Sequence, residues 1–179
     1  VLIDLEDTGF RRIKNMNKVS KLSRASSESA NNIYEELASH NVATLCTVDS
    51  EGIPQLTVVY YSVDEDFTIS FATREETKKH ENIANNNQVN MLVYDENMQL
   101  TIQVTGEAHQ ITDREHRDKI TENMYWAARH NDSQLPPVSK LYAGDYVAYQ
   151  VTPKRISMGF FLRPQSGGYD MFETLNFEQ

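Results

Sequence analysis

The segment FTISFATREETKKHENIANNNQVNMLVYDENMQLTIQVTGE, residues 67–107, decides the fold of this chain. Its first part alternates apolar and polar residues, with Phe67, Ile69 and Phe71 on one side, which predicts a strand with one buried face. This strand ends at Thr73, and a short amphipathic helix follows. Three asparagines at 85–87 close the helix. Alternating segments at 89–93 and 100–104 then predict two further strands, joined by a hairpin turn at 95–97.

Thr77, Lys78 and Lys79 fall in the first turn of the predicted helix. Lysines are usually favoured at the other end of a helix, because the first turn has unsatisfied N–H groups and the positive end of the helix dipole. Backbone donors, threonine hydroxyls and two ammonium groups at one place would form a suitable cradle for a phosphate. The pattern is equally compatible with a solvated charge pair that is offset by neighbouring glutamates. These glutamates are Glu75, Glu76 and Glu81.

The length and composition predict one domain with extensions. The chain has 179 residues, of which 39% are hydrophobic and 9% aromatic, as is typical of a soluble globular protein. The net charge of −9 and the pI of about 5.0 disfavour nucleic acid and anionic membranes as partners. No segment has the apolar length of a membrane span or a signal peptide, and a single cysteine, Cys46, excludes an internal disulfide. We therefore expect a cytoplasmic protein.

The residues before the central segment predict an arm, a helix and a meander. Apolar residues at positions 30, 33, 34, 37 and 38 follow helical spacing, with Ser26 or Ser27 as the cap. Strands are expected at 42–48 and 55–63, joined by a turn that contains Gly52. Together with the strand that starts at Phe67, they would form a three-stranded meander before the short helix.

The residues after residue 104 predict more strands and one more helix. Gly106 allows a bulge or bend, and Thr112 with Glu115 fits a capping box at the start of a helix that reaches Ala128. Strands are expected at 146–151 and 156–161, separated by Thr152 and Pro153, with a last strand at 169–177. This pattern predicts a mainly β fold of the α+β class, a small antiparallel barrel with flanking helices. We expect an arm at 1–25, a barrel domain at 26–161 and a C-terminal tail or strand at 162–179.

No motif indicates a metal site or a nucleophilic catalyst. The five histidines have neither the H-E-x-x-H spacing nor a cysteine partner, so no metal ligands are predicted. Nothing resembles a nucleophile elbow, and glycine-rich dinucleotide signatures are missing.

The order of these features resembles the FMN-binding split barrel of the pyridoxamine 5′-phosphate oxidase-like superfamily, especially its general-stress-protein branch. The likeness covers residues 33–111 and depends on F-A-T at 71–73, T-K-K at 77–79, V-N-M-L-V at 89–93 and G-E-A at 106–108. A looser match covers residues 151–156. The resemblance implies an antiparallel split β-barrel of the FMN-binding type, with FMN as the cofactor.

The resemblance also implies which residues would hold the cofactor. In that superfamily a strand-end threonine and a following basic pair bind the FMN phosphate, which corresponds here to Thr73, Lys78 and Lys79. The strand matching residues 57–61 lies along the flavin ring and ribityl chain, and Thr101 matches a polar residue from the second subunit. The candidate cofactor-binding residues are Thr57, Val58, Val59, Tyr60, Ala72, Thr73, Thr77, Lys78, Lys79, Thr101 and Gln103.

Two departures from the oxidase itself argue against vitamin B6 as the substrate. The oxidase has an arginine and a lysine on the strand equivalent to residues 56–61, where this chain has no basic residue. Its C-terminal Arg-Leu-His-type substrate motif is also missing, because Ser-Met-Gly-Phe stands at 157–160.

Two classes of function follow from these features. The first is an FMN-dependent oxidoreductase with an unknown small-molecule substrate. The second is a stress-related protein that binds flavin or haem on the same barrel without catalysis, and His80 is the candidate haem ligand near the lysine pair. A homodimer is expected in either case, because Thr101 and Gln103 make one face of their strand polar. The alternative is that these two residues face solvent.

Overall fold

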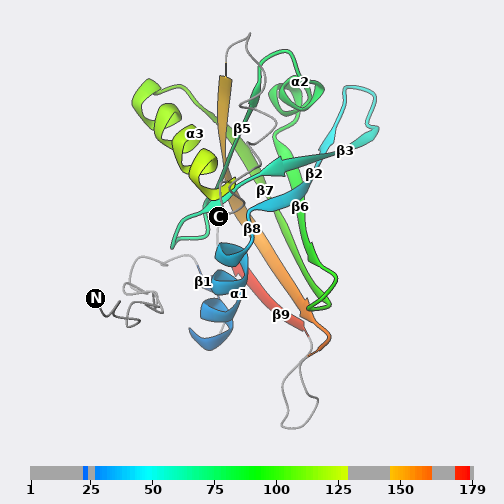
Figure 1. The fold of residues 1–179 in the computed structure, drawn as a ribbon. Coiled ribbons are helices and arrows are strands. Elements are labelled where there is room, and N and C mark those ends of the chain that lie inside the picture. The colour runs from blue at the N-terminus through cyan, green and yellow to red at the C-terminus, as the bar shows by residue number, and fades with distance from the viewer. Residues whose placement is uncertain (1–21, 24–26, 129–145, 163–171, 178–179) are drawn as a thin grey trace, which may run out of the picture.

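Antiparallel strands form most of the molecule (Figure 1). The computed structural model describes residues 22–23, 27–128, 146–162 and 172–177. The strands are β1 (Leu22–Ser23), β2 (Val42–Val48), β3 (Pro54–Tyr60), β4 (Ser62–Val63), β5 (Ile69–Arg74), β6 (Gln88–Asp95), β7 (Leu100–Ile111), β8 (Tyr146–Phe160) and β9 (Phe172–Phe177). The helices are α1 (Ser27–Ser39), α2 (Lys78–Asn85) and α3 (Arg114–Ala128). Within these residues no helix is long and apolar enough to cross a membrane.

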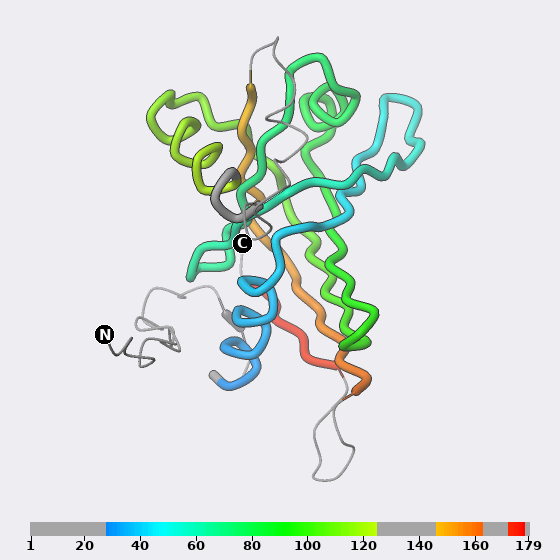
Figure 2. The backbone as a smooth tube through the Cα atoms, viewed as in Figure 1, coloured from blue at the N-terminus to red at the C-terminus, as the bar shows by residue number. Residues whose placement is uncertain are grey.

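The sheet curls because its longest strand has different neighbours at its two ends. The strands follow the order β1-β9-β8-β7-β6-β2-β3, while β5 pairs with β4 and β8. On one side β8 pairs with β7, and on the other its first part pairs with β5 and its last part with β9. The result is a curled half-barrel, in which β9 lies beside β8 and close to α1 (Figure 2). The predicted antiparallel split barrel is therefore confirmed.

The predicted three-stranded meander is wrong. The expected strand at 55–63 is divided at Tyr61 into β3, which pairs with β2, and β4, which pairs with β5. The backbone N–H of Tyr61 donates to the carbonyl of Asn41, and its buried hydroxyl donates to the carbonyl of Leu37. These contacts turn the chain, so that β5 pairs with β8 instead of β3.

Strand β5 is buried on both faces instead of one. It begins at Ile69, because Phe67 has a φ of 67° and belongs to the preceding turn, in which its N–H donates to the carbonyl of Asp64. Ser70 and Ala72 are buried as well as the alternating apolar residues. Pairing with β8 and contact with α3 explain this burial.

The two strands expected on either side of Thr152 and Pro153 are one strand, β8. The irregularity is absorbed by a bulge opposite Gly106, where the register with β7 shifts. A Cβ at Gly106 would lie 2.4 Å from the carbonyl oxygen of Thr152, so only glycine allows this close approach. The bulge expected at Gly106 is therefore confirmed.

The expected last strand is found as β9, and residues 169–171 lie outside the described residues, as do Ser26 and most of the arm. The domain boundaries stay predictions.

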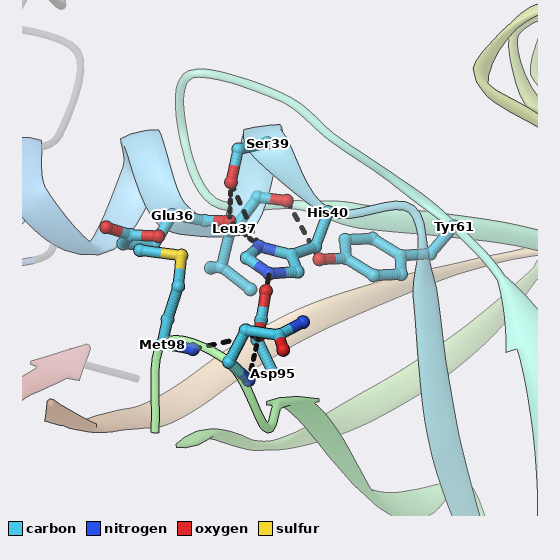
Figure 3. Close-up of polar contacts among 8 residues, drawn as sticks. Glu36, Leu37, Ser39, His40, Tyr61, Asp95 and Met98 are labelled. Carbon is cyan, nitrogen blue, oxygen red and sulfur yellow. Dashed lines mark hydrogen bonds and ion pairs between the residues drawn. The ribbon is translucent and has the colours of Figure 1, made fainter. Parts of the chain in front are cut away.

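A histidine ties the end of α1 to the turn after β6 (Figure 3). His40 Nδ1 lies 2.7 Å from the carbonyl oxygen of Glu36, and Nε2 lies 3.4 Å from Oδ2 of Asp95. Both partners are acceptors, so the ring makes both contacts when both of its nitrogens carry protons. The N–H of Met98 lowers the pKa of Asp95, assisted by His40 and the N–H of Asn97. This cluster holds α1 against the barrel.

Helix α3 has a different cap from the predicted one. The carboxylate of Asp113 accepts the N–H of His116 at 2.7 Å, and the helix begins at Arg114. Asp113 is therefore the cap in place of Thr112, because its side chain reaches the third N–H of the helix.

The side of the sheet away from the core is open. We define the open face by its exposed apolar residues, which the strand register places on the same side of four strands: Val42, Leu56, Val58, Tyr94 and Phe172. The residues between them are mostly uncharged polar residues, including Thr44, Asn90, Gln103, Ser157 and Thr174. Core residues such as Leu45, Met91 and Ile102 point to the other side. The open face thus combines exposed apolar side chains with uncharged polar ones, and the exposed Arg155, which pairs with Thr105 and Asn176, adds one charge to it.

Candidate functional site

Three polar side chains, those of Thr73, Thr77 and Lys79, meet where β5 ends and α2 begins. We call them the lysine cluster. Lys79 Nζ donates to Thr73 Oγ1 at 3.1 Å, and Thr73 Oγ1 lies 3.1 Å from Thr77 Oγ1. The Thr77 hydroxyl donates to the carbonyl of Arg74 at 2.8 Å, so Thr73 must donate to Thr77. The hydrogen bonds therefore run in one direction, from the ammonium group through the two hydroxyls to the backbone carbonyl. All the residues that form them lie within the seven-residue segment 73–79.

Lys79 is a half-buried cation that has no counter-ion among the described residues. Its burial lowers the pKa of its ammonium group below the ordinary value. No carboxylate of the described residues forms an ion pair with it, and the one acceptor that it contacts, Thr73, is neutral. A partly desolvated ammonium with spare donors is electrostatically suited to an anionic ligand.

The first turn of α2 adds backbone donors. Thr77 is the N-cap residue but makes no side-chain cap, because its hydroxyl is bonded to Arg74. The N–H groups of His80 and Glu81 both donate to the carbonyl of Thr77. In the described part of the chain the N–H groups of Lys78 and Lys79 have no acceptor. The helix end therefore offers two free donors and the positive end of its dipole beside Lys79.

Lys78 does not join this cluster. Its Nζ pairs with Glu81 Oε2 at 2.8 Å, and its side chain is 71% exposed. Successive residues of a helix point about 100° apart, so only one of two neighbouring lysines can face Thr73. Of the predicted basic pair, the structure brings only Lys79 to the two threonines. Lys78 is instead a solvated charge offset by a glutamate, which was the alternative interpretation of the sequence.

Arg74 is a basic residue that the sequence analysis missed. Its guanidinium pairs with Glu76 at 2.5 Å, and its buried Nε has no acceptor in the part of the chain that the structure describes. It follows Thr73 directly in β5, so its side chain and that of Ala72 lie on the opposite face of the strand from Thr73. Successive residues of a strand point to opposite faces, so the sequence alone could have shown that Ala72 and Arg74 do not share the face of Thr73.

The predicted residues of β3 divide between the two faces of the sheet. Thr57 and Val59 point inward, half-buried and buried, on the face that also carries Gln55. Val58 is 65% exposed on the open face, and Tyr60, at the end of β3, is partly buried against the core. Thr57 and Val59 thus belong to the interior side of the barrel, and Val58 does not.

Thr101 and Gln103 lie far from Thr73 along the sheet. Thr101 pairs with Gly159 on β8, whereas Thr73 pairs with Val147, twelve positions earlier (147 to 159). At about 3.3 Å per residue, this separation is up to about 40 Å along the strand. Thr101 and Gln103 face outward, half-exposed and exposed. One chain therefore does not bring them to the lysine cluster.

His80 is engaged with a core tyrosine. Its Nδ1 lies 2.6 Å from the hydroxyl of Tyr149, whose ring is 1% exposed and stacks on Phe71 with centroids 5.4 Å apart. Burial raises the pKa of the Tyr149 hydroxyl to about 12. The phenol is therefore protonated near neutral pH and can donate to Nδ1. Among the described residues no three histidine, cysteine or acidic side chains are grouped to hold a metal ion.

A family model described as pyridoxamine 5′-phosphate oxidase matches residues 30–158, more than two thirds of the chain. The chain belongs to this family. The match covers the lysine cluster and the open-face residues of β2, β3 and β6, whereas Phe172 on β9 lies beyond it. No curated protein matches the sequence.

Solved structures share the fold of this family member at low sequence identity. One is a protein related to general stress protein 26 of Bacillus subtilis, from Clostridium acetobutylicum: 15% identity, 85% of this chain, 96% of that chain and a TM-score of 0.60. An F420 reductase is 21% identical over 69% of this chain and 94% of its own, with a TM-score of 0.55. A haem-binding protein from Mycobacterium smegmatis is 17% identical over 86% of this chain and 59% of its own, with a TM-score of 0.60.

Proposed function

We propose that this protein is an FMN-binding flavoprotein of the pyridoxamine 5′-phosphate oxidase family. The observation that supports this most is Lys79, a half-buried cation beside two threonine hydroxyls and two helix N–H groups. Within the described segments this lysine has no carboxylate partner and the two N–H groups have no acceptor. These are the donors that a phosphate monoester requires. In this proposal Lys79, Thr73 and Thr77 bind the phosphate, with Lys78 contributing its backbone N–H, and the flavin extends toward Thr57 and Val59.

The second part of the proposal is a homodimer that forms through the open face. Exposed apolar residues surrounded by uncharged polar ones are typical of the core of a protein interface. Thr101 and Gln103 belong to this face but lie too far from Thr73 to reach the same cofactor in one chain. They can contact it only if they come from a second copy.

The activity that we propose is an oxidoreductase reaction with a small-molecule substrate. The bound flavin would supply the hydride or single-electron chemistry, and this chain would position it and exclude water. Vitamin B6 is not the proposed substrate, because β3 has no basic residue to bind its phosphate. Flavin-loaded protein should oxidise pyridoxamine 5′-phosphate very slowly under oxygen, and turnover comparable to that of a true oxidase would contradict this assignment.

Haem is the alternative ligand, because a haem-binding protein shares the fold and His80 lies next to Lys79. The contact of His80 with Tyr149 uses Nδ1, which leaves Nε2 as the nitrogen that could bind iron. An absorbance spectrum of the purified protein separates a flavin, a haem and a protein without cofactor.

The test of the proposed function is titration of cofactor-free protein with FMN and with riboflavin. We expect FMN to bind at least ten-fold more tightly, because riboflavin lacks the phosphate that Lys79 would contact. Equal affinities would contradict a phosphate site at Lys79, and a haem spectrum would favour the alternative. The cytoplasmic location stays a prediction from the sequence.

A further inference from the structure

A buried amide on α2 connects this helix to the β2–β3 hairpin. Asn82 is 2% exposed, and its Nδ2 donates to Thr47 Oγ1 at 3.0 Å and lies 3.4 Å from Gln55 Oε1. Thr47 is itself 1% exposed and stands opposite Gln55 in the β2–β3 pair. Asparagine is mostly exposed in proteins, and a buried amide is costly unless its donors are satisfied. Strands β2 and β3 thus provide hydrogen-bond acceptors that fix the side chain of Asn82 on α2.

The connection continues to the turn of the hairpin. Gln55 Nε2 donates to Asp49 Oδ2 at 3.1 Å, while Asp49 Oδ1 accepts the N–H groups of Ile53 and Glu51. These bonds, that of Ile53 first, lower the pKa of Asp49, so its carboxylate stays ionised and keeps accepting them. The amide of Asn82 is therefore held by side chains that are themselves fixed.

The rotation of α2 about its axis decides which lysine faces the threonines. Asn82 is three residues from Lys79 and four from Lys78, so it lies between them around the helix axis, and fixing Asn82 fixes the direction of both lysines. Lys78 points about 100° away from Lys79, toward Glu81 and solvent. Ile83 is buried next to Asn82, but an apolar contact is not directional and would tolerate a rotation of the helix.

We propose that Asn82 is a positioning residue for the anion site: its bonds to Thr47 and Gln55 fix the rotation of α2 that aims Lys79 at the phosphate. This inference rests on the proposed function, in which Lys79 binds the phosphate of FMN. Asn82 acts through Lys79 and does not touch the ligand.

The main variant is Asn82→Leu, which has a similar volume but no hydrogen-bonding groups. Asn85→Leu is the matched control, because it makes the same change at an exposed position of the same helix. Thr47→Val removes the partner on β2 with a smaller change, and serves if Asn82→Leu does not fold. All variants are compared by thermal unfolding before binding is measured.

The first readout is the ratio of FMN to riboflavin affinity. We expect this ratio to fall about ten-fold in Asn82→Leu, less in Thr47→Val and not in Asn85→Leu, with riboflavin affinity nearly constant. A merely structural role would weaken both flavins equally and leave the ratio unchanged, and that result would overturn the inference.

The second readout does not need a flavin. The pKa of Lys79 is measured by NMR of ¹³C-dimethylated protein, with Lys79→Arg to assign the signal. Burial lowers this pKa in the wild type, so a released Lys79 in Asn82→Leu should have a higher, more ordinary value. An unchanged Lys79 pKa in a folded variant overturns the inference. If the wild type binds FMN and riboflavin equally or not at all, the proposed function fails, while the Lys79 pKa still decides whether Asn82 positions the lysine.

Discussion

The lysine cluster and the open face are the two regions for which we propose a function, and they are built in opposite ways. The cluster consists of polar groups within residues 73–79, three of them joined by short hydrogen bonds and partly withdrawn from water. The open face consists of apolar residues from strands far apart in the sequence, all exposed. A polar site is thus partly buried and an apolar surface is exposed, which reverses the usual distribution. This is why we propose a ligand for the first region and a partner for the second.

The largest expected effect comes from charge on the open face. The double variant Val58→Asp and Tyr94→Asp would place four carboxylates in the interface of the proposed dimer, and like charges there cost several kcal/mol. We expect monomers at micromolar concentration and at least hundred-fold weaker FMN binding. Sedimentation velocity, followed at the flavin wavelength and in the far ultraviolet, measures both quantities.

Ile53→Asp is the control for this variant, because Ile53 is 52% exposed but lies in the turn before β3. It should remain a dimer that binds FMN. A stable monomer of the charged variant that keeps its flavin would refute the shared site. It would show that the lysine cluster binds flavin without the open face.

The next effect is expected at the lysine cluster. Lys79→Met should weaken FMN by about ten- to a hundred-fold, because charge-assisted hydrogen bonds contribute about 1.5–3 kcal/mol each, while riboflavin should bind as before. The cofactor-free variant should unfold at the same temperature as the wild type or higher, since the folded state disfavours the charged ammonium. A large loss of thermal stability with both flavins equally weakened would mean that Lys79 is structural.

A smaller effect is expected from pH. The folded, cofactor-free protein holds Lys79 at a pKa below that of an ordinary lysine, so its charge is lost earlier as pH rises. FMN affinity should therefore fall as pH rises toward the usual lysine range, whereas riboflavin affinity should not follow. Since the charged form is the disfavoured one, deprotonation of Lys79 should also add to the stability of the cofactor-free fold.

Lys79→Arg tests the origin of this pH dependence, because an arginine stays protonated over the whole range. Isothermal titration at several pH values should show an alkaline loss of FMN affinity in the wild type and little in the variant. The same loss in both proteins would assign the titration to another group.

The smallest effect is expected at Lys78. Exposed ion pairs contribute little because water and salt screen them, so Lys78→Ala should change FMN affinity by about two- to three-fold at most. The comparison with Lys79→Met is made by titration at equal ionic strength. Equal losses in the two variants would show that α2 rotates when the ligand binds.

Much of the local structure follows from the sequence by itself. Val89, Met91 and Val93 alternate with polar residues and are all buried on one face of β6, because a strand has a side-chain period of two. The same pattern holds for Leu100 and Ile102 on β7. The composition of residues 73–79 likewise predicts a helix end with basic and hydroxyl groups. Each of these properties depends on residues close in sequence.

Only the tertiary structure decides how these parts meet. A local pattern gives the face of a strand but not its neighbour, so the pairing of β5 with β8 and the single strand β8 could not be read from the pattern. In our proposal the rotation of α2 is similarly set from outside the segment, through the contact of Asn82 with Thr47, 35 residues away. A helix cannot aim two adjacent side chains at one point, so a fixed rotation would leave Lys79, and not Lys78, facing the threonines.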